Sequence, residues 1–254
     1  MENKTGDRLL NILEYVIIAE RPLRLIEVAK GMGINSSTAL RYLNTLVLAG
    51  YVEQNPESLR YQPTYKIQAL ANHINLKGEL RNYARPVLEK LAEMFGESVC
   101  MSVEQNMRAV YIDTIRSIHS LSTFQEVGGT SPMHCTGNGK VLMLNYTEEQ
   151  IDEYIELRGL KKYTDHTITD KETLMNELAE IREKGFARDR EEREYGVSCL
   201  SFPVYNYKNE VIAGISVTGP KERMAGITHE ERFDEARQLV DGLSERFGYK
   251  SVIE

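Results

Sequence analysis

Three stretches in the second half of the chain carry side chains that could bind a small polar molecule. The first is Pro132–Lys140, where small residues lead into a predicted helix. The second contains the carboxylate of Asp189 and, further along, the thiol of Cys199. The third is a predicted strand with Ser216 and Thr218, whose hydroxyls point to one side because side chains alternate along a strand.

The chemistry of these stretches is recognition of an anion or a polar metabolite. Backbone N–H groups at the start of a helix lack intrahelical partners, so they form a favourable seat for a carboxylate. Hydroxyl, thiol and carboxylate groups around that seat would make a small polar cup. A structural interpretation fits the same residues, with Cys199 as a packed core thiol and Asp189 as a capping residue.

His134 and Cys135, inside the first stretch, allow two other kinds of chemistry. A thiol nucleophile needs a base, so these two residues with Asp189 could form a thiol-dependent hydrolase. Neighbours on a strand point apart, which disfavours such a pair. The same residues could ligate a metal, although they lack a regular ligand spacing. We therefore predict no catalytic residue, metal or cofactor, and keep the hydrolase, a metal-binding regulator and a purely structural dimerising module as alternatives.

A second polar group, near the N-terminus, is suited to DNA. The polar face of a predicted helix is formed by Ser36, Ser37, Thr38, Arg41, Tyr42 and Asn44. Such side chains on the first turns of a helix can contact base edges in the major groove. Arg41 is the strongest candidate, because a guanidinium contacts guanine through two hydrogen bonds. Arg60 and Lys66 flank the next hairpin and are predicted to meet phosphates.

The elements that must position these residues form a helix-turn-helix with a wing. Gly31 and Gly33 end a first helix, and Asn35 supplies N-cap chemistry for the second. Residues 51–65 read as strand, turn and strand. A helix pair joined by a glycine turn also occurs in all-α folds, but the hairpin and the polar face favour DNA binding. The apolar stripe of the second helix is predicted to be Leu40, Leu43, Leu46 and Val47.

The remaining chain predicts an α+β fold with an antiparallel sheet. A linker helix with exposed apolar positions would pack on a second copy or on its own C-terminal domain. The predicted domains are 1–66 (winged helix-turn-helix), 67–79 (linker helix) and 80–254 (effector binding). Strand patterns fall at 98–103, 109–115, 120–124, 187–190, 198–205 and 211–217, and helix patterns at 139–145, 148–158, 171–184 and 228–247.

Composition and charge bound the class of protein. The 254 residues are 41% hydrophobic and 27% charged, which is ordinary for a soluble globular chain. The net charge is −7, yet residues 1–66 hold eight basic and seven acidic side chains, so one copy should bind DNA modestly and a dimer is favoured. No apolar run approaches the roughly 20 residues that cross a bilayer. With no signal-peptide core and three scattered cysteines, we expect a cytoplasmic protein without a membrane partner.

Together these motifs resemble the IclR family of bacterial and archaeal transcription regulators. The resemblance implies a winged helix-turn-helix joined by a linker helix to a GAF-like effector domain, in a homodimer that allows a tetramer. The matching segments are Leu25–Ala29, Gly33–Thr38, Arg41–Leu43, Leu46, Gly50–Val52, Pro132–Thr136, Gly139–Lys140, Glu191–Glu192, Tyr195–Val197, Cys199 and Pro203–Val204.

The resemblance also implies a function and a site. Operator DNA would be bound or released under the control of a small organic-acid-like effector, with repressor and activator both open. Two departures from the family pattern stand out. Tyr65–Ile67 replaces a Leu-Gly pair, and Gly137–Asn138 replaces small apolar residues, which predicts a ligand of different polarity. The implied effector site is Thr136, Gly137, Asn138, Asp189, Cys199, Ser216 and Thr218.

Overall fold

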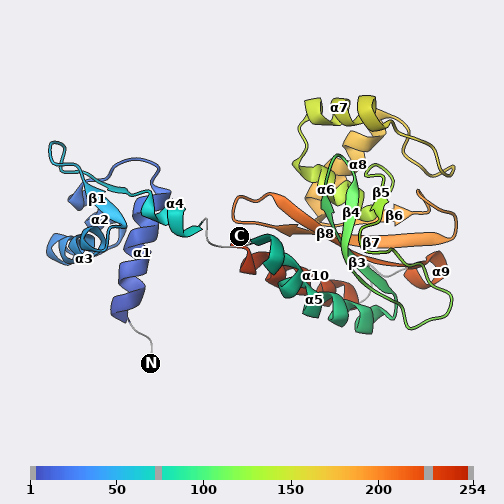
Figure 1. Cartoon of the computed structure of the whole chain (residues 1–254), viewed down its shortest axis with the longest axis horizontal. Helices are drawn as coiled ribbons and strands as arrows, with labels where there is room; N and C mark the ends of the chain where they lie inside the picture. Colours follow the sequence, from blue (N-terminus) through green and yellow to red (C-terminus); the bar gives the residue numbers. More distant parts are fainter. Residues whose placement is uncertain (1–3, 72–75, 226–230, 251–254) are drawn as a thin grey trace. The chain divides into compact units, whose positions relative to one another are not determined.

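The computed structural model describes residues 4–71, 76–225 and 231–250, which fold as two compact units, Met1–Leu76 and Lys77–Glu254. Figure 1 shows a small helical unit with a hairpin and a larger unit built on a sheet. The predicted α+β class is confirmed. Residues 72–75 of the predicted linker helix and the predicted start of the last helix at Thr228 lie outside the described residues. Within the described ranges, no helix is long and apolar enough to cross a membrane.

The N-terminal unit is a winged helix-turn-helix, as predicted. Asn35 caps the second helix of the motif, because its side-chain oxygen accepts the Thr38 N–H at 2.8 Å. Gly50 follows that helix with a φ of 76°, a conformation that favours glycine. The elements are α1 (Lys4–Ile18), α2 (Leu25–Gly31), α3 (Ser36–Leu48), β1 (Val52–Gln54), β2 (Tyr61–Pro63) and α4 (Lys66–Ala71).

The buried face of α3 differs from the prediction. Leu40 is 38% exposed, whereas Tyr42 is 5% exposed and packs in the core of this unit. The predictions that Leu40 is core and that Tyr42 faces DNA are therefore wrong. The spacing of three and four residues fits a buried stripe that contains Leu40 and equally one that contains Tyr42. The ring of Tyr42 buries more apolar surface than the side chain of Leu40 would. The residues that are buried on α3 are Ala39, Tyr42, Leu43 and Leu46.

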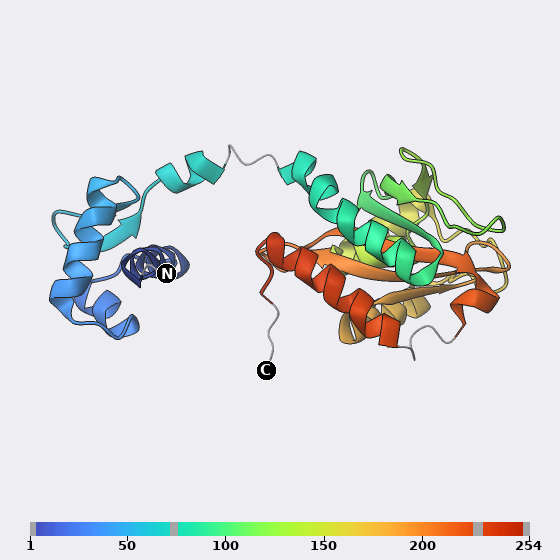
Figure 2. The ribbon, with the colours of Figure 1, turned by 90° about the horizontal axis from the view of Figure 1, so that it is seen from below.

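The C-terminal unit is built on an antiparallel sheet with the strand order β5-β4-β3-β8-β7-β6. Helices α5 and α10 lie side by side on one face of this sheet, where they form the larger core (Figure 2). Helix α6 lies on the other face, with α7 and α8 beyond it (Figure 1).

The strands are β3 (Ser98–Glu104), β4 (Ala109–Ile115), β5 (Thr130–Ser131), β6 (Ala187–Arg190), β7 (Val197–Tyr205) and β8 (Val211–Pro220). The helices are α5 (Leu76–Phe95), α6 (Gly137–Leu142), the 3-10 turn η1 (Met143–Asn145), α7 (Glu148–Arg158), α8 (Lys171–Lys184), α9 (Lys221–Met224) and α10 (Glu231–Arg246).

One predicted strand does not form. Residues 120–124 alternate in polarity but lie in a loop, and Leu121 is 73% exposed. The apolar side chains of this segment therefore have no core to enter, which is the condition that an alternating strand requires. The short strand β5 instead pairs with β4, next to this loop.

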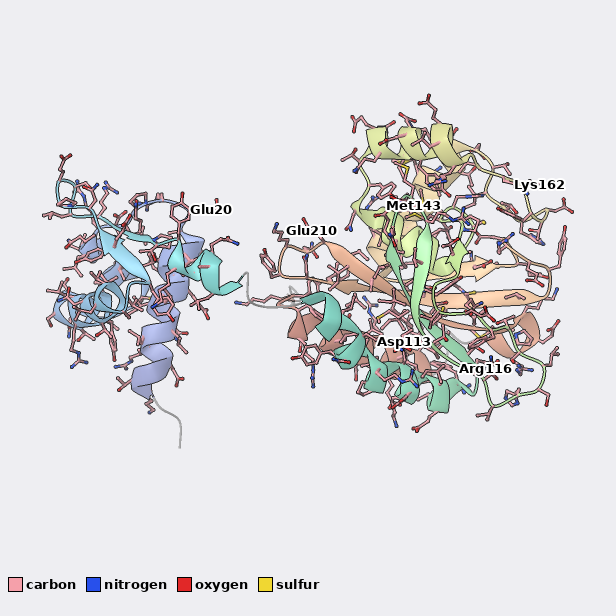
Figure 3. The ribbon with its side chains drawn as sticks, viewed as in Figure 1. Glu20, Asp113, Arg116, Met143, Lys162 and Glu210 are labelled. Carbon is pink, nitrogen blue, oxygen red and sulfur yellow. The ribbon has the colours of Figure 1, made fainter. Side chains whose placement is uncertain are left out.

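A β-bulge interrupts the pairing of β3 with β4. The register shifts between Met101, opposite Asp113, and Ser102, opposite Tyr111. The extra residue turns Tyr111 and Asp113 to opposite faces of the sheet. On the α5 side, Asp113 is 1% exposed and accepts hydrogen bonds from Arg85 Nη1 at 2.9 Å and Arg81 Nε at 3.3 Å, which fixes α5 to β4 (Figure 3).

Candidate functional site

A cavity of about 390 Å³ lies between the sheet and the start of α6. Its walls come from the start of α6, from all six strands of the sheet, from the turn between β6 and β7, and from the loop that precedes β5. The structure therefore brings together all seven residues of the implied effector site, from three parts of the sequence. These residues are Thr136, Gly137, Asn138, Asp189, Cys199, Ser216 and Thr218.

Two glycines allow α6 to pack closely, Gly137 against the sheet and Gly139 against the segment before the helix. A Cβ on Gly137 would lie 2.2 Å from Ser201 Oγ, and a Cβ on Gly139 would lie 2.3 Å from the Met133 Cα. Thr136 caps the helix, since its hydroxyl accepts the Gly139 N–H at 3.2 Å. The helix thus begins at Gly137, two residues before the predicted start, and its first two residues line the cavity.

The floor of the cavity is a connected row of small polar groups. Ser216 Oγ lies 3.2 Å from Thr218 Oγ1, which donates to Cys199 Sγ at 3.3 Å. Cys199 Sγ lies 3.8 Å from Asp189 Oδ2. Burial raises the pKa of Cys199 well above its usual value, so the thiol stays protonated and acts as a weak donor.

Asp189 is a carboxyl group with an unusual proton affinity. Burial raises the pKa of Asp189 to about 7, and the charge of Glu192 acts in the same direction. The Glu192 N–H, which donates to Asp189 Oδ1 at 2.8 Å, opposes this shift. Near neutral pH the carboxyl is therefore a mixture of protonated and ionised forms, able to donate or accept a hydrogen bond.

The raised pKa of Asp189 predicts a pH dependence of stability. The folded pKa of about 7 exceeds the usual 3.8, so the stabilising contribution of this group is full below about pH 4 and is lost as pH rises through 7. Asparagine does not ionise, so the free energy of unfolding of Asp189→Asn lacks this decrease as pH rises. We expect the variant to gain about 2 kcal/mol relative to the parent between pH 5 and pH 8.

Urea unfolding at several pH values measures this difference. Asp234→Asn, at an exposed position on α10, is the matched control for the loss of one carboxylate. Parallel pH profiles of the unfolding free energy for Asp189→Asn and the parent would contradict the raised pKa of Asp189.

Lys140 organises the wall behind Asp189, a role that its place in a Gly-Lys helix start did not reveal. Its ammonium is fully buried and donates to Glu192 Oε1 at 2.6 Å, Glu177 Oε1 at 2.7 Å and the Arg188 carbonyl at 2.5 Å. Burial alone lowers the pKa of Lys140, but the charges of Glu192 and Glu177 outweigh it, so the pKa is raised and the side chain stays charged. Lys140 thus holds the turn that follows β6 against α6 and α8.

Several lining residues were not predicted. Tyr111 depends on the bulge in β4, Arg193 on the turn between β6 and β7, and residues 122–125 on the loop mistaken for a strand. The only sequence signal for this loop was its hydroxyl content. The additional lining residues are Cys100, Tyr111, Ser122, Thr123, Phe124, Gln125, Thr130, Ser131, Arg193, Glu194 and Val197.

The alternative sites around His134 and Cys135 are not formed as imagined. His134 Nδ1 lies 3.0 Å from the Tyr154 hydroxyl and Nε2 lies 3.1 Å from the Lys161 carbonyl, so both nitrogens are engaged away from Cys135. Burial raises the pKa of Cys135 to about 12, which disfavours a thiolate nucleophile. Neither residue lines the cavity. Across the described ranges, no cluster of three or more His, Cys, Asp and Glu side chains is arranged to hold a metal ion.

The predicted DNA face of α3 is largely exposed. Ser36, Ser37, Arg41 and Asn44 are exposed and Thr38 is half-buried. The Ser37 hydroxyl donates to Asn35 Oδ1 at 2.9 Å, so it also supports the helix cap.

The wing cations both make contacts within the unit. Arg60 Nη1 donates to the Pro22 carbonyl at 3.0 Å, and Lys66 Nζ donates to the Ala49 carbonyl at 2.7 Å. These bonds tie the wing to the helices. Arg60 remains a predicted DNA contact, in addition to this role in holding the wing.

Comparisons with known proteins identify the same two units. The model of the IclR helix-turn-helix domain matches residues 6–56, and that of the bacterial transcriptional regulator IclR C-terminal domain matches residues 74–245. The chain is 30% identical over 243 residues to the HTH-type transcriptional regulator XynR of Escherichia coli K12, covering 96% of both. It is 30% identical over 219 residues to the transcriptional repressor IclR of the same strain, covering 85% of this chain and 80% of that protein.

Solved structures share the fold. Pseudomonas aeruginosa HmgR superposes with a TM-score of 0.76 at 20% identity, covering 98% of this chain and 100% of that one. An IclR homolog of Microbacterium hydrocarbonoxydans, complexed with 4-hydroxybenzoate, has a TM-score of 0.60 at 21% identity, covering 94% of this chain and 98% of that one. At these identities the likeness extends to the fold alone.

Proposed function

The chain belongs to the IclR family of bacterial transcriptional regulators, and we propose that a small organic-acid-like metabolite in the cavity controls its binding to operator DNA. The observation that carries this proposal is the convergence of the seven implied effector residues on one polar cavity. Ligand binding in the C-terminal unit would shift the protein between two states with different operator affinity. By linkage, operator and effector must then change each other's affinity by one common factor.

The lining supports an acid as the effector. Hydroxyls, the amide of Asn138 and the guanidinium of Arg193 line the cavity, and such donors stabilise a carboxylate. The raised pKa of Asp189 removes part of the negative charge that would repel an anion. The bound 4-hydroxybenzoate of the Microbacterium homolog supports the same ligand class.

The DNA-binding part of the proposal assigns α3 to the major groove. The wing would contact the backbone, within a homodimer that places two copies of α3 on two half-sites. The near-neutral charge of residues 1–66 supports a dimer, because one copy releases few counterions. We retain the division into 1–66, 67–79 and 80–254 as binding, linking and sensing parts, with a tetramer as a further assembly.

A binding assay tests the proposed function. The full chain should bind DNA from upstream of its own gene more tightly than scrambled DNA, with an affinity that falls as salt is raised. A panel of carboxylic acids should include one that changes this affinity. Equal binding to both DNAs over the whole salt range would refute the proposal.

Arg41→Ala is expected to weaken specific operator binding by about 1–3 kcal/mol, because a guanidinium that contacts a guanine edge is lost. Binding to scrambled DNA should change much less. Fluorescence anisotropy with both DNAs measures the two affinities, with Arg8→Ala on α1 as a control for loss of one positive charge. An equal loss on both DNAs would make Arg41 a phosphate contact instead.

A further inference from the structure

Arg193 is the only cationic side chain among the described residues that line the cavity. It lies on the turn between β6 and β7, four residues after Asp189. Burial raises the pKa of Tyr111, and the positive charge of Arg193 opposes part of this shift. The guanidinium therefore lies near enough to the Tyr111 hydroxyl, on β4, for its charge to act across the cavity. Glu194, the next lining residue, is exposed to solvent.

Two of the carboxylates of this turn are already paired, whereas Glu194 beside Arg193 is exposed. Glu191 pairs with Lys221 at 3.1 Å, and Glu192 pairs with the buried Lys140 at 2.6 Å. Arg193 forms no ion pair with any carboxylate that the structure describes. Arg193 is exposed at the rim of the polar cavity, and a cation without a described carboxylate partner there is available to an anionic ligand.

An aromatic platform holds the guanidinium in place. Its central carbon lies 3.9 Å from the centre of the Tyr163 ring, and Tyr163 in turn stacks on His134. The Tyr154 hydroxyl and the Lys161 carbonyl fix His134 on both nitrogens. Stacking uses the flat face of the guanidinium and leaves its edge donors for a carboxylate.

Polar atoms elsewhere in the lining also lack partners. Thr123 Oγ1 and Asn138 Oδ1 are buried and have no hydrogen-bond partner among the described residues. Buried polar atoms are normally paired, so these two atoms favour a ligand that carries hydroxyl groups.

We propose, on the basis of the proposed function, that Arg193 selects an anionic effector. The ligand class is a hydroxylated carboxylic acid, whose carboxylate pairs with the guanidinium while its hydroxyls bond the polar lining. The volume of about 390 Å³ leaves room for a ligand that contacts both Arg193 and the hydroxyls of Ser216 and Thr218. Arg193 is then a specificity-determining residue at the mouth of the site.

Calorimetry with the full chain tests the proposal through matched pairs of probes. The pairs are gluconate and sorbitol, glycerate and glycerol, and 4-hydroxybenzoate and 4-hydroxybenzamide. At least one acid should bind, and its neutral counterpart should bind about tenfold more weakly or not at all. Arg193→Gln should weaken the acid about 10- to 100-fold, because a charge-assisted hydrogen bond is lost, and Arg193→Lys should weaken it less.

Arg190→Gln is the control, because Arg190 lies on the same segment but lines a different pocket. It should leave the affinity for the acid unchanged. The proposal is overturned if no acid binds, if an acid and its neutral counterpart bind equally, or if Arg193→Gln and Arg190→Gln have the same effect. Operator binding by the parent and by Arg190→Gln, measured without ligand, reports on DNA binding separately, so a failure here is distinct from a failure to bind DNA.

Discussion

Lys140→Met is expected to lower the free energy of unfolding by about 3–5 kcal/mol, the cost of leaving buried charge uncompensated. The side-chain lengths are similar, so packing changes little and the effect reports the charge. Glu192 is 6% exposed and loses the ammonium that pairs with it. Because the Glu192 N–H holds Asp189, the cavity should loosen and ligand affinity should fall as well.

Urea unfolding of the parent and three variants measures this effect. Lys184→Met removes a half-exposed lysine that pairs with Glu180, and should change stability by less than about 1 kcal/mol. Adding Glu192→Gln to Lys140→Met removes the stranded charge and should restore part of the loss. If Lys140→Met were as mild as Lys184→Met, the ammonium would not hold this wall together.

Gly139→Ala is expected to cost about 3 kcal/mol, the upper end of the usual cost of overpacking. The added methyl group would lie 2.3 Å from the Met133 Cα and 2.4 Å from its carbonyl oxygen, and backbone atoms cannot move aside as a side chain can. Relief requires α6 to move away from the segment before it. The first turn of α6 lines the cavity, so ligand binding should weaken together with stability.

Gly242→Ala on α10 is the matched control for this substitution. A Cβ at Gly242 meets no atom within 4 Å, so alanine should stabilise the helix by up to about 1 kcal/mol. Thermal unfolding should therefore move in opposite directions for the two variants. A Gly139→Ala protein as stable as the parent would show that the close approach of α6 is not required.

The sequence predicted the elements that have strong local signals. Asn35 caps α3 as predicted, and the helices predicted at 148–158 and 171–184 form behind Thr147 and Asp170, whose short side chains also accept a backbone N–H. The strand predicted at residues 120–124 does not form. Alternating polarity indicates a strand only when one face is buried, and burial depends on the rest of the fold. The prediction that Tyr42 faces DNA was wrong for a related reason. The spacing alone fitted a buried stripe on α3 that contains Leu40 and another that contains Tyr42.

The site could be predicted as motifs but not as a cavity. Spacing placed the hydroxyls of Ser216 and Thr218 on one side of β8, and the family resemblance supplied the other members. Lys140, Tyr111 and Arg193 were missed as a group, because their roles depend on partners far away in the sequence. Lys140 reaches Glu192 across 52 positions, and Tyr111 enters the lining only because a bulge reverses the facing of β4.

Under the proposed function, that bulge has a consequence for how the C-terminal unit would respond to a ligand. Tyr111 lines the cavity. Asp113, two residues further along β4, forms ion pairs with Arg81 and Arg85 in the first half of α5. Helix α5 is the first element of its unit after the DNA-binding part of the chain. If a ligand displaces Tyr111, the two-residue step from Tyr111 to Asp113 offers a direct path by which the displacement can reach α5.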